Sequence, residues 1–441
     1  PPRLDLTNEE LLRAHLHAIW LSAAGLHLGS SLRDILDVSG DHPSLEILPH
    51  VQTKLDDGGA RVRALQRAEE ALGPTVQAML GEEGVAREWL KRELDAVPQS
   101  FSNALKRWRG LYRAAFDQAV HQSAIARDAS RPPGDRAKAK QLRSEAEAQL
   151  SLLLETSVQQ HSDFYSYRYF ASEGFLPGYN FPRLPLSAYI PGRRRLKGTD
   201  EFLSRPRFLA ISEFGPRSYI YHEGSRYLTN KVILPVERDE TSLVRRACRC
   251  NHCGYIHPLG EEPAPDLCES CETPLPSAMN NLFRMENVAT RRRDRITSDE
   301  EERQRLGFEL ETSVRFAIRD GRESVITAEV FEEDDKSLGV LRYGSAATLW
   351  RMNLGWRRRA RPEEKGFVLD LERGYWKTDK ALEEEEQDDP LSPSLMRVVP
   401  YVEDRKNSLI LDIPEVREMG AEGMASLGAA LKVGIQAHFQ L

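Results

Sequence analysis

Two Cys-x-x-Cys pairs constrain the fold of this 441-residue chain more than any other sequence feature. The pairs are Cys250 with Cys253 and Cys268 with Cys271, and fourteen residues separate them. A two-residue spacing allows a tight turn to direct both sulfurs toward one point, and four thiolates enclose a tetrahedral zinc ion completely. Gly254 and Gly260 allow the intervening segment to return the second pair to the first. The pattern therefore predicts a four-cysteine zinc ribbon whose ion is structural, since no coordination position is left for water.

The alternatives for these cysteines are a disulfide framework, a redox dithiol and free thiols. Disulfides would be spread along a secreted chain, whereas all five cysteines here lie within 24 residues. A thioredoxin-like site needs one Cys-x-x-Cys pair in a βαβ context, which this region lacks. A metal site in a reducing compartment fits better, so we expect a cytoplasmic protein. Cys248 is the spare thiol, and His252 and His257 are replacement ligands that the site does not need.

The composition indicates a globular chain with two to four folding units. Hydrophobic residues make up 40% of it, which is enough for a large core, and the net charge is −7. No stretch approaches the roughly 18 consecutive apolar residues of a membrane span, so we expect no membrane partner. No signal peptide is visible, and the chain starts with Pro1-Pro2 rather than Met. We therefore expect a piece of a longer protein.

The change of residue pattern along the chain predicts an α+β fold, in which helical layers come first and a β-rich domain that carries the zinc ribbon follows. Residues before about 163 show helical spacing of apolar residues, whereas aromatic, Pro and Gly residues become frequent from Phe164 onward. We expect five segments: an N-terminal helical segment at 1–58, a long-helix region at 59–163, a β-rich segment at 164–245, the zinc ribbon at 246–276, and a β-rich domain at 277–441 that ends in a helix.

Local patterns predict individual helices and strands. Apolar residues from Phe101 to Ala119 form one helical stripe, a second helix runs from about Asp135 to Leu154, and residues 422–440 regain a helical period. Short β-type runs occur at Phe208–Ile211, Tyr219–Tyr221 and Tyr227–Leu234, and His222-Glu223-Gly224-Ser225 between the last two predicts a hairpin turn. Further hairpins are expected for Phe308–Ile318 with Ser324–Phe331, Phe367–Leu371 with Tyr375–Lys377, and Arg397–Val402 with Leu409–Leu411.

Basic residues are unevenly distributed and point to nucleic acid. Residues 171–260 hold 14 Lys and Arg against 8 Asp and Glu, although the whole chain is acidic. Clustered cations can follow a phosphate backbone, and aromatic rings beside them can stack on bases. The alternative is ordinary surface arginines with core aromatics. The candidate DNA-contact residues are Arg193, Arg194, Arg195 and Lys197, the nearby Tyr179 and Phe181, and the run Arg357, Arg358 and Arg359; Arg291–Arg293 form a further run.

Several stretches of the chain carry a resemblance to a known family: Asp5–Leu11 with Ala14–His17, Ser162–Arg183, Ile211–Pro216 with Tyr219–Tyr227, Cys250–Cys271, Leu349–Trp356 and Ala425–Leu441. Together they resemble the region that follows the motor in large bacterial superfamily 2 DNA helicases with an MrfA-type zinc-binding domain. The resemblance covers most of the chain, and its most specific parts are the residues around Gly174–Arg183 and the four cysteines. Relatives of this kind occur as repair helicases and in phage-defence systems such as DISARM and Druantia.

This resemblance implies a part in ATP-driven translocation on DNA, or in its unwinding. Both motor lobes are absent from this chain, and no phosphate-binding loop is present. ATP and Mg²⁺ are therefore expected only through motor lobes that lie upstream in the same polypeptide or on a partner chain. The chain alone is expected neither to hydrolyse ATP nor to unwind DNA.

Three functions remain open at the level of sequence. The preferred one is a zinc-stapled platform that guides single-stranded or forked DNA for a helicase motor in anti-phage defence or DNA repair. The second is a docking module that binds subunits of a defence complex without touching DNA. The third is an enzyme such as a nuclease, which would need carboxylates converging on a hard metal ion; no spaced set of that kind stands out.

Overall fold

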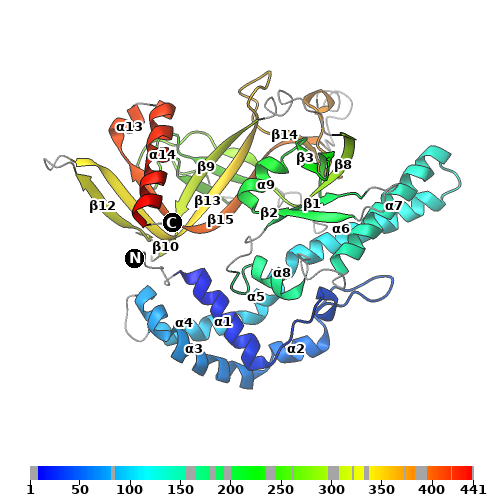
Figure 1. The fold of residues 1–441 in the computed structure, drawn as a ribbon, viewed down its shortest axis with the longest axis horizontal. Helices are drawn as coiled ribbons and strands as arrows, with labels where there is room; N and C mark the ends of the chain where they lie inside the picture. The colour runs from blue at the N-terminus through cyan, green and yellow to red at the C-terminus, as the bar shows by residue number, and fades with distance from the viewer. Residues whose placement is uncertain are drawn as a thin grey trace.

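Helices and sheets occupy separate parts of the molecule. The computed structural model describes residues 8–80, 85–154, 165–178, 185–192, 200–234, 244–260, 263–295, 307–319, 322–331, 337–371, 373–382, 395–418 and 420–439. The N-terminal helices form one layer, and two β-sheets lie against it on one side (Figure 1). This arrangement is α+β, as the change of residue pattern along the chain predicts.

The helical layer is built around one apolar core. Its buried residues run from Leu12 to Leu176 and include Trp20, Phe101 and Trp108, which are at most 2% exposed. The core thus continues beyond residue 163 into the short helix that contains Tyr169 and Phe170. Its elements are α1 (Glu9–Ala24), the 3₁₀ turn η1 (Leu32–Asp34), α2 (Pro49–Leu55), α3 (Gly58–Leu80), α4 (Val85–Asp95), α5 (Val97–Ala104), α6 (Lys106–Arg127), α7 (Pro133–Leu154) and α8 (Ser166–Ser172).

The apolar stripe after Phe101 forms two helices rather than one. Helix α5 ends at Ala104 and α6 begins at Lys106, and Leu105 between them is fully buried. Trp108 and Tyr112 continue the buried stripe on α6, and their rings stack at 5.1 Å. Helix α7 returns alongside α6 and forms a long hairpin with it, which extends away from the sheets (Figure 1).

A five-stranded sheet follows in the order β2-β1-β8-β4-β3. The predicted hairpin of Tyr219–Tyr221 with Tyr227–Leu234 is confirmed: β3 and β4 pair across Glu223 and Gly224, whose φ angles of 43° and 69° are those of a primed hairpin turn. The strands are β1 (Leu186–Ile190), β2 (Glu201–Arg205), β3 (Tyr219–His222), β4 (Ser225–Val232) and β8 (Val288–Arg295).

The predicted strand at Phe208–Ile211 is wrong, because these residues form the helix α9 (Arg207–Glu213). Pro206 immediately precedes the helix, where its fixed φ and missing N–H are tolerated. Ala210, Ile211 and Phe214 are buried on one helical face against the five-stranded sheet. A four-residue apolar run carries no periodicity that separates a strand from a buried helix, so packing decides.

The second sheet has eight strands, and its two long strands organise it. Strand β13 pairs with β15 along one edge and with β12 and β9 in succession along the other. Six of the strands are hydrogen-bonded to their neighbours in the order β12-β13-β15-β7-β5-β6. In addition, β14 pairs with β15 and β9 pairs with β13. The strands are β5 (Val244–Arg249), β6 (Ile256–Leu259), β7 (Met279–Arg284), β9 (Phe308–Phe316), β12 (Ile326–Phe331), β13 (Ser337–Trp356), β14 (Phe367–Asp370) and β15 (Leu395–Asp412), beside the small pair β10 (Ile318–Arg319) and β11 (Arg322–Glu323).

One of the predicted hairpins is wrong, and another forms only as a short pair. The polar residues after Val402 do not turn the chain, because β15 stays paired with β13 across them from Tyr401 to Asp412. Between Phe308–Ile318 and Ser324–Phe331 only β10 and β11 pair, with Ile318 opposite Glu323; the longer strands β9 and β12 both add to the same edge of β13. The third hairpin is confirmed by the bridge between Leu369 and Trp376.

The last two described elements are the helices α13 (Pro414–Glu418) and α14 (Gly420–Phe439). The predicted helical period of 422–440 is confirmed over α14, but its apolar side chains are not buried. Val433 is 65% exposed and Met424 is 50% exposed. Among the described residues, no helix has both the length and the hydropathy to span a membrane.

Candidate metal centre

The first cysteine pair forms the turn between β5 and β6. The backbone N–H of Cys250 donates to the Tyr255 carbonyl at 2.9 Å, and the N–H of Gly254 donates to the Cys250 carbonyl at 3.0 Å. Gly254 has a φ of +73°, which only glycine adopts at no steric cost. These bonds fold the pair into a knuckle whose two sulfurs face the same side.

The second pair repeats this geometry residue by residue. The N–H of Cys268 donates to the Thr273 carbonyl at 2.9 Å, and the N–H of Glu272 donates to the Cys268 carbonyl at 2.9 Å. Glu272 takes the place of Gly254 and has a left-handed φ of +56°. Arg342 of β13 fixes this knuckle to the sheet by donating to the Ser270 hydroxyl at 2.7 Å.

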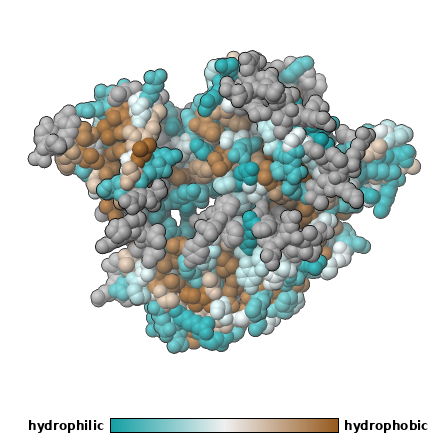
Figure 2. Space-filling model, viewed as in Figure 1, coloured by the Kyte–Doolittle hydropathy of each residue, from teal (hydrophilic) through white to brown (hydrophobic). Residues whose placement is uncertain are grey.

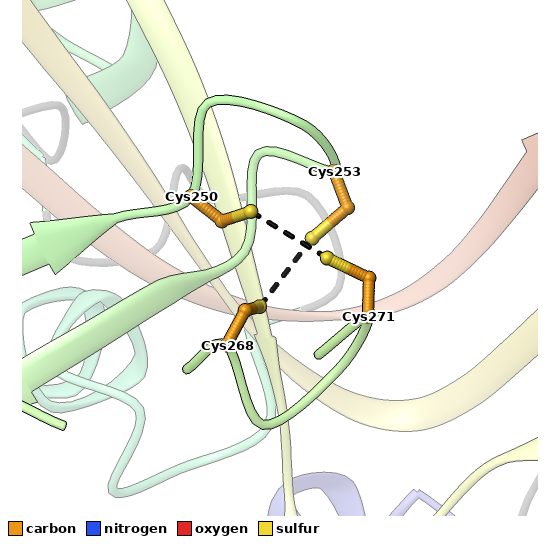
Figure 3. Close-up of side chains that lie close together, drawn as sticks. All are labelled: Cys250, Cys253, Cys268 and Cys271. Carbon is orange, nitrogen blue, oxygen red and sulfur yellow. Dashed lines mark hydrogen bonds between the residues drawn. The ribbon is translucent and has the colours of Figure 1, made fainter. Parts of the chain in front are cut away.

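The two knuckles bring four sulfurs to one point (Figure 3). The Sγ atoms of Cys250 and Cys271 are 3.5 Å apart, those of Cys253 and Cys268 are 3.7 Å apart, and all four lie within 4.8 Å of one another. A tetrahedral ion that is ~2.3 Å from each sulfur places its ligands about 3.8 Å apart. The sulfurs are therefore spaced to hold a metal ion, and they are too far apart for disulfides.

The thiols differ in how readily they ionise. Burial raises the pKa of Cys253 and of Cys268. Burial acts in the same direction on Cys271, but hydrogen bonds from the hydroxyl and backbone of Thr273 outweigh it and lower the pKa of this thiol to about 5. Cys271 therefore supplies a thiolate at neutral pH, and a bound cation favours deprotonation of the other ligands.

The other candidate ligands stay outside the group. Cys248 is fully buried on β5, and its thiol donates to the Pro276 carbonyl at 3.7 Å. His257 is 2% exposed and lies 3.7 Å from a Glu269 carboxylate oxygen. Neither residue, nor His252, belongs to the metal-ligand group found among the described residues.

The cluster is an integral part of the eight-stranded sheet. Cys250, Tyr255 and Cys268 are buried against Phe316 and Ala347, which belong to β9 and β13. A bridge pairs Tyr255 with Val314, so the knuckle extends the sheet rather than standing apart from it. A metal ion held by these sulfurs would therefore brace the edge of the sheet where β5, β6 and β9 meet.

The predicted DNA-contact residues fall into two groups. Tyr179, Phe181, Arg193–Arg195 and Lys197 lie outside the described residues. Arg357, Arg358 and Arg359 follow directly on β13. Arg357 donates to the Phe308 carbonyl at 3.0 Å, and Arg359 pairs with Glu309 at 2.6 Å and donates to the Pro362 carbonyl. Arg358 is exposed. Two of the three arginines thus also hold the turn after β13 in place.

Arg359 lines a concave pocket of about 260 Å³ that the sequence did not reveal. Four more cations line it, and the carboxylates that pair with its cations are Glu309, Glu364 and Asp379. Arg397 pairs with Glu364 and Asp379, at 3.0 and 2.9 Å, and Arg361 pairs with Glu364 at 2.7 Å. The additional cations are Arg217, Arg361, Lys377 and Arg397.

Arg217 and Lys377 leave the pocket with unbalanced positive charge. Both side chains are exposed, and neither makes an ion pair with another described residue. Arg217 adopts a left-handed φ of 59°, which costs a non-glycine residue of the order of 1 kcal/mol. Its backbone N–H is fixed by the Thr229 carbonyl at 3.0 Å. No sequence run marks these residues, because they are brought together only by the pairing of β14 with β15 and by the loop before β3.

A third group of cations lies on the five-stranded sheet. Arg291, Arg292 and Arg293 are exposed on β8, where Arg291 lies opposite Leu228 and Arg292 opposite Tyr227. Strand β1 runs parallel to β8, with Tyr189 opposite Ala289, so both strands lead to the same end of the sheet.

Comparison of the chain with models of protein families, with curated proteins and with solved structures gave no match. The function therefore has to be inferred from the chemistry of the four-cysteine group and of the cationic surfaces.

Proposed function

We propose that this chain is a DNA-binding accessory region for an ATP-dependent superfamily 2 helicase motor that it does not itself contain, acting in anti-phage defence or DNA repair in the cytoplasm. In this proposal the sheets form a rigid platform that holds single-stranded or forked DNA for the motor. The observation that carries it is the pocket of Arg217, Arg359, Arg361, Lys377 and Arg397, whose five cations face three carboxylates, Glu309, Glu364 and Asp379. A concave surface with excess positive charge is the form that binds backbone phosphates.

In the same proposal the four cysteines form a zinc ribbon. The ion is Zn²⁺ because four thiolates in a tetrahedral arrangement are the preferred ligands of this borderline-soft metal. With four protein ligands the ion has no open position, so its role is to fix the knuckles against β9 and β13. The zinc ribbon supports the platform, and the arginines contact the DNA.

The test is the binding of a labelled single strand and a labelled forked duplex to the zinc-loaded chain over a salt series. Each phosphate contact that is lost reduces the slope of log affinity against log salt by about 0.7–0.9. We expect the double variant Arg217→Ala/Lys377→Ala to reduce this slope by about 1.4 for the single strand and about 1.8 for duplex DNA. The same titration with Arg193–Arg195 replaced by Ala tests whether the run predicted from sequence belongs to the same surface.

A matched control removes two cations from the helical hairpin. Arg127 and Lys140 are exposed on α6 and α7, away from the sheets, so Arg127→Ala/Lys140→Ala changes the net charge equally. Equal effects of the two double variants would show that only net charge matters. Flat binding by the zinc-loaded chain would refute DNA contact altogether.

One observation favours the alternative, a docking module without DNA contact. Apolar side chains are exposed over α14 and β12, and Figure 2 shows brown, hydrophobic surface in this part of the molecule. Large exposed apolar patches mark protein–protein contacts. Under this alternative, co-purification with motor or defence-complex subunits would resist salt and nuclease, and Val433→Asp would abolish it while the arginine variants would not. The exposed side chains are Ile326, Phe331, Met424, Leu431, Val433, Ile435 and Phe439.

A further inference from the structure

The two knuckles are attached to the eight-stranded sheet in different ways. The first, Cys250–Cys253, is the turn of a continuous hairpin, because β5 and β6 pair directly beside it. The second, Cys268–Cys271, lies outside the strands, and the bridge beside it joins Leu267 to Pro274 within the same loop. In the part of the chain that the structure describes, no strand pairs with this loop. Backbone pairing therefore fixes the first knuckle, whereas the second depends on side chains for its position.

Two arginines of the sheet hold the residues that lie between the second pair of cysteines. Nη2 of Arg315, on β9, pairs with a Glu269 carboxylate oxygen at 3.0 Å. Nη1 of Arg342, on β13, donates to the Ser270 hydroxyl at 2.7 Å. The arginine side chains are only 22% and 23% exposed, so water and salt screen these contacts less than those of surface pairs. Each residue of the second knuckle that is not a cysteine is therefore bound to a different strand.

Arg315 also contacts the hairpin of the first knuckle. Its Nη1 donates to the Ile256 carbonyl at 3.2 Å, where β6 begins. Its guanidinium lies 5.6 Å from the centre of the Tyr255 ring, within the range of a cation–π interaction. One guanidinium thus joins the segment that follows the first knuckle to the interior of the second.

Arg342 is held in place by further contacts of its own. Its Nη2 pairs with the carboxylate of Glu323, and its guanidinium lies 5.0 Å from the centre of the Phe316 ring. Phe316 belongs to the same buried cluster as Cys250 and Cys268. Because a guanidinium presents its N–H groups in a rigid plane, the pairing with Glu323 also fixes the direction from which Nη1 reaches the second knuckle.

Contacts of this kind affect metal binding although they do not involve the sulfurs. Groups that orient metal ligands raise affinity, and their removal typically costs about 10–100-fold. Without the two arginines, the sulfurs of Cys268 and Cys271 would have to be ordered against the first knuckle when the ion binds. The entropy lost in that ordering would be subtracted from the binding free energy.

We propose that Arg315 and Arg342 are positioning residues of the metal centre, which hold the second knuckle so that its sulfurs face those of the first before the ion binds. This inference rests on the proposed zinc ribbon and goes beyond it, because it assigns part of the metal affinity to two residues that are not ligands. It also makes the occupancy of the site depend on β9 and β13, the strands that carry the arginines.

Competition between the zinc-loaded full chain and a chromophoric zinc chelator tests the proposal. We expect Arg315→Ala and Arg342→Ala each to weaken Zn²⁺ binding by about 10–100-fold. Ser270→Ala removes the contact with Arg342 without changing the sheet, and it should also weaken binding. The double variant Arg342→Ala/Ser270→Ala should bind no more weakly than Arg342→Ala, because both changes remove the same hydrogen bond.

A matched control separates metal positioning from general stability. Arg351 also lies on β13, and it donates to the Phe208 carbonyl of α9 at 2.9 Å. Arg351→Ala should reduce resistance to urea but leave Zn²⁺ affinity unchanged. Exchange of Zn²⁺ for Co²⁺ adds a spectroscopic readout, because the visible absorption of Co²⁺ reports the arrangement of its thiolates. We expect an altered Co²⁺ spectrum in Arg342→Ala and an unaltered one in Arg351→Ala.

The possible failures can be told apart. Unchanged Zn²⁺ affinity in the Arg315, Arg342 and Ser270 variants would overturn the proposal and leave the zinc ribbon intact. An equal loss of affinity in Arg351→Ala would overturn it as well, because general destabilisation would then explain the result. If the unaltered chain bound neither Zn²⁺ nor Co²⁺, the zinc ribbon itself would be refuted, and this inference with it.

Discussion

At the scale of single residues, the two knuckles differ at one informative position. Gly254 and Glu272 have the same role and both are left-handed, with φ angles of +73° and +56°. Glycine adopts this conformation without strain, whereas a residue with a Cβ does so at a cost of about 1 kcal/mol. Glu272 is exposed, so its side chain contributes little that would offset the cost.

We therefore expect Glu272→Gly to leave metal content unchanged and to raise the free energy of unfolding by about 0.5–1 kcal/mol. Gly254→Ala should lower it by a similar amount, because the added Cβ meets only ordinary contacts and the strain lies in the backbone. Urea unfolding of both zinc-loaded variants measures these changes. Destabilisation by Glu272→Gly would contradict the equivalence of the two knuckles.

Cys250, which belongs to the four-sulfur group, can be compared with Cys248, which does not. Cys250→Ser removes one of the four converging sulfurs, so we expect less than one metal ion per chain and a loss of at least 2 kcal/mol of stability. Cys248→Ser lies two residues away on β5 and should retain a full metal complement. Elemental analysis of the purified variants gives the metal content directly. Full occupancy in Cys250→Ser would exclude the four-thiolate site.

At the scale of elements, β13 and β15 are the long central pair of strands in the eight-stranded sheet. Trp350 of β13 is 2% exposed and stacks on Tyr401 of β15 at 4.5 Å with an interplanar angle of 6°. Both rings belong to a buried cluster that also contains Ile256 of β6. The same cluster therefore connects the long strands to the hairpin that bears the first knuckle.

Truncation of Trp350 should be among the most damaging single changes in the chain. We expect Trp350→Ala to lower the free energy of unfolding by about 3–5 kcal/mol, because it removes a large buried ring and leaves a cavity. Leu409→Ala is the control, since Leu409 lies on β15 of the same ladder but is 59% exposed; its change should stay within about 0.5 kcal/mol. Chemical denaturation measures both, and similar losses would show that burial is not what stabilises this ladder.

Sequence patterns predicted those elements whose signals are local. Helices α7 and α14 follow from apolar spacing, the β3–β4 hairpin from the turn at Glu223-Gly224, and the sulfur cluster from two Cys-x-x-Cys pairs. Helix α9 was missed because a short apolar run has no decisive period. The length of β15 was missed because the polar residues Glu403–Asn407 suggested a turn. In the structure β15 continues through them, because it stays paired with β13. Arg217 and Lys377 meet only through strand pairing, so no spacing reveals their pocket.

At the scale of the whole molecule, a buried histidine connects helix α1 to the segment after α8. The pKa of His17 is about 4, mainly because burial disfavours the imidazolium; Arg13 lowers it further, while the Phe175 carbonyl, Glu93 and Glu10 raise it. The unfolded chain takes up this proton near pH 6.5. The unfolded state therefore binds the proton first as the pH falls, and the folded state loses stability.

We expect this one group to reduce the free energy of unfolding by about 3 kcal/mol between pH 6.5 and pH 4, with its full contribution present above pH 6.5. His17→Asn cannot titrate, so its stability should fall less steeply over this interval. The comparison of urea unfolding for the two chains at several pH values isolates the effect from that of the thiols. Parallel curves would show that His17 is not responsible.

The contacts of helix α1 have a consequence for the order in which the chain folds. All buried residues of the helical layer's core precede Phe202 and end at Leu176, so this layer can begin to form while later residues are still being synthesised, at about 5–20 residues per second. By contrast, Asn8 bonds to Asn407 and Glu10 pairs with Arg405, nearly 400 positions away. These contacts can close only after β15 has been made. The union of the two layers is therefore a late step in the folding of the chain.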